Sequence, residues 1–134
     1  MTDESKILRD WLTTGEWRLR TDTVLEIPET VLRSLKTFLA ADHADMEELR
    51  LYQATLSTLF GPYRQLAHAH KEVLSAALLK LGTFSKEQFW PAAIGFLNMS
   101  PGLGREAISN WVKVLNLSAE EESELKTELF HAFR

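Results

Sequence analysis

Apolar side chains recur at helical spacing along most of this 134-residue chain, and this periodicity constrains its fold more than any other feature. The stripes within residues 31–39 and 125–133 each place apolar residues on one side of a helix. Such a helix is stable only when its apolar side is buried against another element. The sequence therefore predicts an all-α fold, a single-domain bundle of six or seven short helices over residues 1–134.

Several helix ends are marked by residues with strong capping preferences. Ser85 followed by Gln88, and Ser118 followed by Glu121, match the capping-box pattern. Asp45 is a favoured N-cap residue before another apolar stripe. These signals predict three helix starts, at or just after residues 45, 85 and 118.

Three stretches leave the helical pattern or interrupt it. Within residues 16–27, positions 16–20 alternate apolar and charged side chains, 21–23 are turn-like, and 24–27 are mostly β-branched and apolar. This pattern fits either a small two-stranded β-ribbon or an extended loop. Between Pro62 and Gly82 we expect one helix that ends before the glycine. From Asn98 to Gly104 we expect a seven-residue turn, because this stretch contains a Pro-Gly pair.

The composition excludes several classes of function. The chain has no cysteine, which rules out disulfides, thiolate metal sites and cysteine nucleophiles. Residues 1–10 are acidic and polar, unlike a signal peptide. No apolar run reaches the about 18–20 residues that a membrane span needs. We therefore expect a cytoplasmic protein that does not enter a membrane.

No group of residues has the spacing of a catalytic or metal site. His68 and Glu72 share a helix face, and one pair supplies fewer ligands than zinc needs. Glu128 and His131 have the spacing that di-iron bundles use twice, but a second copy is missing. The serines lie outside any nucleophile motif. We expect no metal, no cofactor and no enzymatic activity.

Segment 85–117 carries a pattern found in DNA-binding proteins. Ile108 and Trp111 recur as buried residues of one helix, and its outward residues could contact bases or phosphates. These outward residues are Arg105, Ser109, Asn110 and Lys113. The segment, about a quarter of the chain, resembles the helix-turn-helix superfamily, which implies docking on DNA through residues 105–113. The pattern also fits a plain bundle helix, and we favour that simpler interpretation because the family has a tighter turn.

The net charge of −4 is unevenly distributed along the chain. Residues 61–117 carry six basic and three acidic side chains, whereas residues 118–134 carry two and five. The DNA-binding pattern therefore lies in a net-positive segment. Arginine and lysine are nevertheless sparser there than on most DNA-binding surfaces.

Large aromatic side chains indicate a third class of function, protein–protein binding. The chain has four tryptophans and seven phenylalanines, and tryptophan is a favoured interface anchor. Trp17 lies beside Arg18 and Arg20 in the non-helical segment. Trp90 precedes Pro91 at an expected kink. We expect both tryptophans to be exposed binding residues, and the alternative is that they fill gaps between helices.

Together these patterns predict a non-enzymatic regulatory protein that binds another protein, of adaptor, inhibitor, antitoxin or immunity type. A homodimer is compatible with this function. The alternative is a DNA-binding transcriptional regulator that uses the helix-turn-helix-like segment. The partner's identity does not follow from the sequence.

Overall fold

The structure is a computed structural model that describes residues 3–14, 27–61 and 64–133, and all regular elements in these ranges are helical. The seven longer helices are α1 (Asp3–Thr14), α2 (Glu29–Leu39), α3 (Met46–Phe60), α5 (Lys71–Phe84), α6 (Lys86–Met99), α7 (Gly104–Leu115) and α8 (Ala119–Ala132). A single-turn helix, α4 (Arg64–Ala67), precedes α5. The expected all-α fold is confirmed. The segment expected to form a ribbon or loop lies outside the described residues, except for its last residue, Ile27.

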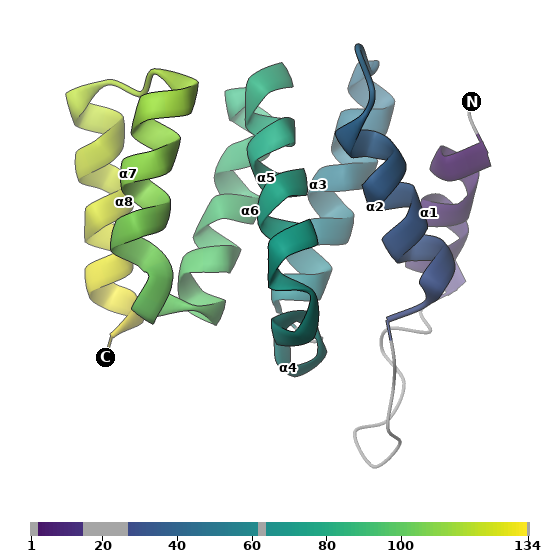
Figure 1. Cartoon of the computed structure of the whole chain (residues 1–134), viewed down its shortest axis with the longest axis horizontal. Coiled ribbons are helices and arrows are strands. Elements are labelled where there is room, and N and C mark those ends of the chain that lie inside the picture. Colours follow the sequence, from purple (N-terminus) through teal and green to yellow (C-terminus); the bar gives the residue numbers. More distant parts are fainter. Residues whose placement is uncertain (1–2, 15–26, 62–63, 134) are drawn as a thin grey trace.

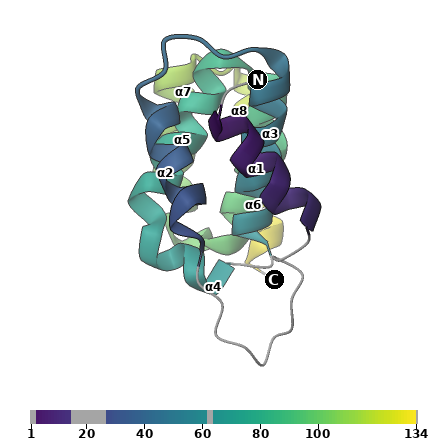
Figure 2. The ribbon, with the colours of Figure 1, turned by 90° about the vertical axis from the view of Figure 1, so that its right-hand side faces the viewer.

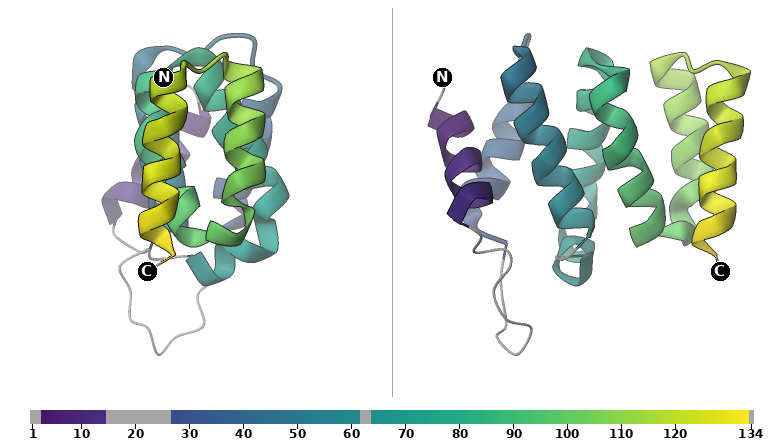
Figure 3. Two further views of the ribbon diagram at one scale, coloured as in Figure 1. Left: turned by 90° about the vertical axis from the view of Figure 1, so that its left-hand side faces the viewer. Right: turned by 180° about the vertical axis from the view of Figure 1, so that it is seen from behind.

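The long helices are stacked in two layers (Figure 1). Helices α1, α3, α6 and α8 lie side by side in one layer, and α2, α5 and α7 form the other. Contacts of α1 with α2, α3 with α5, α5 with α6, and α7 with α8 join the two layers. Seen from one end, the layers face each other (Figure 2). Helices α7 and α8 form one end of the stack, and α1 and α2 form the other (Figure 3).

The core lies between the layers and is built from leucine and aromatic side chains. Trp111 of α7 meets two rings of α6 edge-on, with centroid distances of 5.2 Å to Phe89 and 5.8 Å to Phe96. Phe38 of α2 stacks on Tyr52 of α3 at 4.0 Å. Edge-to-face and offset ring pairs of this kind add to the stabilisation that burial provides. The two Trp111 contacts fix α7 against α6, and the Phe38–Tyr52 pair joins α2 to α3.

The capping signals in the sequence mark the helix starts correctly. The Asp45 carboxylate accepts a hydrogen bond from the Glu48 backbone N–H at 2.8 Å at the start of α3. Ser118 and Glu121 form the complete capping box at the start of α8. At the start of α6, Ser85 Oγ accepts a hydrogen bond from the Gln88 backbone N–H at 3.2 Å. The reciprocal bond of a capping box, from the Ser85 backbone N–H to the Gln88 side chain, is not formed between these two described residues.

The helix expected between Pro62 and Gly82 differs from the one observed. Its described part is broken by a 3-10 turn at His68–His70, and α5 then continues through Gly82 to Phe84. Gly82 lies within α5, where side chains of α6 and α7 approach the helix backbone closely. A Cβ atom there would lie 2.6 Å from Leu115 Cδ1, and 3.1 Å from a ring carbon of Phe89. The glycine serves packing between helices and does not end the helix.

The seven-residue turn expected from Asn98 to Gly104 is also wrong. Helix α6 reaches Met99, and only four residues, 100–103, precede α7; three of these form a 3-10 turn. The helical hydrogen-bond pattern of α6 continues to Ser100, whose backbone N–H donates to the Phe96 carbonyl at 2.9 Å. Helices α6 and α7 lie across the long axis of the stack and run in opposite directions (Figure 1). Their four-residue connection has the length of a helix-turn-helix turn, so the length of the turn does not argue against that resemblance.

Candidate docking groove at the end of the stack

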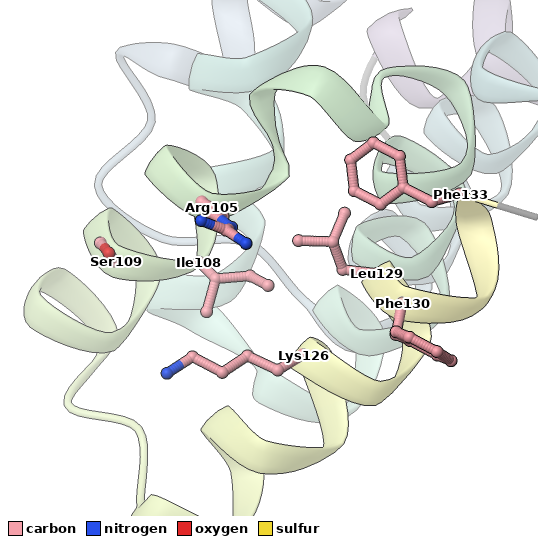
Figure 4. A pocket seen from close by; sticks show the side chains of 7 residues that line it. All are labelled: Arg105, Ile108, Ser109, Lys126, Leu129, Phe130 and Phe133. Atoms are coloured by element: carbon pink, nitrogen blue, oxygen red, sulfur yellow. The ribbon is translucent and has the colours of Figure 1, made fainter.

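A groove of about 500 Å³ lies between α7 and α8, with the other helices behind it (Figure 4). Three of its lining residues come from the first half of α7 and four from the last part of the chain. They are Arg105, Ile108 and Ser109, and Lys126, Leu129, Phe130 and Phe133. The groove therefore lies on the last two helices of the stack, at the level where α7 begins and α8 ends.

The groove has a buried apolar floor and an exposed aromatic rim. Ile108 and Leu129 form the floor and are only 1% and 5% exposed. Phe130 and Phe133 are 69% and 63% exposed, more than any other large apolar side chain in the described part of the chain. Two neighbouring phenylalanines with this exposure are unusual on a monomer surface, and such patches mark interaction sites.

Local sequence features hold α7 and α8 in a fixed hairpin. Asn116 ends α7 in the left-handed conformation, with φ 54°, which asparagine tolerates better than most residues. The backbone N–H groups of Asn116 and Leu117 both donate to the Val112 carbonyl, the second at 3.2 Å, which closes the end of α7. At the far end of the hairpin, a Cβ atom on Gly104 would overlap Leu129. These features bring the two helices close together beneath the groove.

The groove carries positive charge and no acidic side chain. Arg105 lies in the first turn of α7, is exposed, and has no ion-pair partner among the described residues. Lys126 Nζ lies 3.1 Å from Glu122 Oε2, so its charge is partly offset. No aspartate or glutamate lines the groove. Arg105 is therefore the cation that a bound ligand would meet.

Most acidic residues of α8 lie toward the opposite end of that helix, and Glu128, directly before Leu129, is the exception. Glu120, Glu121 and Glu122 occupy its first turn, where the helix dipole favours negative charge. The Ser118 backbone N–H donates to the Glu121 carboxylate at 2.9 Å, and Lys86 Nζ lies 3.6 Å from the same oxygen. The hydrogen bond, with the lysine as a further cause, lowers the pKa of Glu121. Helix α8 thus places most of its acids away from the aromatic groove, and none of them lines it.

The four residues of the DNA-binding pattern are all exposed on α7. Arg105 and Ser109 line the groove, whereas Asn110 and Lys113 do not. Ile108 and Trp111 are buried, as the pattern predicted. Both interpretations of the segment expected this burial, so it does not separate a DNA-binding helix from a plain bundle helix.

Of the two tryptophans expected to be binding residues, only Trp90 is described, and it does not line the groove. Trp17, Arg18 and Arg20 lie outside the described residues. Trp90 is half-buried and packs against the core, which agrees with the gap-filling alternative and not with an exposed binding residue.

The apolar stripe predicted within residues 125–133 includes both groove phenylalanines. Leu125 and Leu129 of that stripe are buried, but Phe130 and Phe133 are not. The four residues span about 140° of the helix circumference, the width of an ordinary buried stripe. The sequence therefore carried no signal that two of them are exposed.

The described residues show no arrangement for metal binding. They contain no cluster of three or more histidine, aspartate or glutamate side chains that could hold an ion. No helix among them is long and apolar enough to cross a membrane. No family model matches the chain, and no significant match was found among curated proteins or solved structures. The groove is therefore the feature on which a function can be argued.

Proposed function

We propose that this protein is a non-enzymatic regulatory or adaptor module that binds another protein through the groove between α7 and α8. The observation that carries the proposal is the pair of exposed rings, Phe130 and Phe133, beside the buried floor. Burying a phenylalanine side chain contributes about 1.5–3 kcal/mol. Large side chains that fill pockets near the centre of an interface often dominate its binding energy.

The arrangement favours a macromolecular partner over a small molecule. The groove is open, and its rings project from the last turn of α8 (Figure 4). Small-molecule pockets usually enclose most of the ligand's surface. A protein partner can cover the groove together with the surfaces around it.

Affinity capture with a matched control tests the proposal. The double variant Phe130→Asp, Phe133→Asp removes both rings and places charge in the groove. The control is Met46→Asp, which changes a 43% exposed apolar residue at the start of α3. We expect at least one protein from cell extract to bind the wild type and the control, and to be lost on the double variant. A set of bound proteins identical for all three would contradict the proposal.

The capture result requires that the variants remain folded. Substitutions of exposed residues usually change the free energy of unfolding by less than about 0.5 kcal/mol. We therefore expect urea denaturation midpoints of both variants close to that of the wild type. A large loss of stability in the double variant would mean that the rings belong to the core.

DNA binding is the second candidate, favoured by the exposure of all four outward residues of α7. A titration with mixed duplex DNA at two salt concentrations separates it from protein binding. DNA binding through α7 would weaken steeply as the salt concentration rises. It would also weaken in the variant Lys113→Ala, whose site lies outside the groove. We expect no binding that depends on Lys113, because α8 places glutamates on the same hairpin. Tight, salt-sensitive binding lost in this variant would reverse the order of the candidates.

A further inference from the structure

We infer that the segment bound in this groove is an amphipathic helix whose apolar anchors are flanked by carboxylates. The inference rests on the proposed function and names the chemistry of the partner. It follows from two independent features of the groove, its shape and its charge.

The shape of the groove suits a helix. An amphipathic helix can lay its apolar face into a hydrophobic groove of its partner. Within the stack, helices also pack on two neighbours at once, since α5 contacts both α2 and α3, and α6 contacts both α3 and α5. At the outer side of α7 and α8, no further helix of the described chain covers the groove (Figure 3). A helix from a partner would extend the packing that already holds the fold together.

The charge of the groove suits carboxylates. Its lining holds two cations and no acid, and Arg105 has no ion-pair partner in the described chain. The N-cap residue of α7, Leu103, provides no side-chain hydrogen bond to that helix end. The partial positive charge of the helix N-terminus therefore adds to that of the guanidinium. An aspartate or glutamate of the partner helix, one helical turn from an apolar anchor, would contact both the N-terminus of α7 and the Arg105 guanidinium.

A second copy of the chain fits the groove less well through α8. The ligand must carry an apolar anchor and a carboxylate close together, because Phe130, Phe133 and Arg105 line one groove. In α8 the exposed acids Glu120 and Glu124 lie in the N-terminal half, and the one acid near the exposed rings, Glu128, is half-buried. Self-association through this face is therefore an outcome of the test and not the proposal.

The experiment uses three synthetic helical peptides of about 18 residues, longer than either α7 or α8. All have leucine at the same i, i+3, i+4 and i+7 positions, and their flanking positions carry glutamate, glutamine or lysine. Binding of each peptide is measured by calorimetry to the wild type, to Arg105→Glu, to Phe130→Asp, and to Lys113→Glu. The last variant is the matched control, because Lys113 is exposed on α7 but outside the groove.

We expect the glutamate peptide to bind the wild type at least about fivefold more tightly than the lysine peptide, the scale of one exposed ion pair. Arg105→Glu should reverse this order, Lys113→Glu should leave it unchanged, and Phe130→Asp should abolish binding of all three.

Other outcomes overturn the inference in distinguishable ways. Equal binding of all three peptides that is lost in Phe130→Asp would leave a docking groove without a preference for acids. Absence of binding by all three would overturn the helical ligand, while affinity capture still decides the docking function. A dimer of the protein alone that Phe130→Asp dissociates, measured by sedimentation, would assign the groove to a second copy.

Discussion

Some residues at contacts between helices have roles that no local sequence pattern indicates, and Gly82 is one of them. Glycine often ends a helix, and Gly82 was expected to do so. In the structure it lies inside α5, against Leu115 and Phe89, where a side chain would not fit. Its role depends on α6 and α7, which no local pattern specifies. Asp45 and Ser118 were interpreted correctly because their capping bonds reach only three residues along the chain.

The variant Gly82→Val tests this contact. Its Cβ would lie within 3.1 Å of two side chains that are themselves packed in the core, and overpacking of this kind costs about 1–3 kcal/mol. We expect the free energy of unfolding, measured with urea, to fall by an amount in that range. Gly102→Ala is the control, since nothing lies within 4 Å of a Cβ there. Equal stability of Gly82→Val and the wild type would contradict the close packing of α5.

At the scale of single elements, the capping box at the start of α8 makes stability depend on pH. The pKa of Glu121 is lowered by the hydrogen bond from Ser118 and by the nearby Lys86. A carboxyl whose pKa is lower in the folded state stabilises the fold above its unfolded pKa. This contribution is lost as the pH falls through the lowered pKa.

The variant Glu121→Gln isolates that contribution. We expect the wild type to exceed it in free energy of unfolding at neutral pH, and the difference to shrink as the pH is lowered through the range in which carboxyls titrate. Urea denaturation at a series of pH values measures this difference. Glu124→Gln changes the net charge equally and leaves the capping box intact, so it serves as the control. A difference between wild type and Glu121→Gln that does not vary with pH would contradict the assignment.

At the scale of the whole molecule, the sequence predicts the helices but not their order in the layers. Periodicity shows which side of a helix is apolar, and it does not show which neighbour covers that side. Phe130 and Phe133 were therefore placed in the core, although α8 forms the end of the stack and leaves them exposed. The groove exists because the two layers end there, a property of the complete arrangement.

Photo-crosslinking in cells tests the docking groove most directly. A photoreactive benzophenone residue is placed at position 130, 133 or 46, and adducts are detected after illumination. The account predicts a protein adduct from positions 130 and 133, and none from position 46, where Met46 is exposed away from the groove. Adducts from position 46 alone, or no adduct from either groove position, would contradict the claim that α7 and α8 form the binding surface.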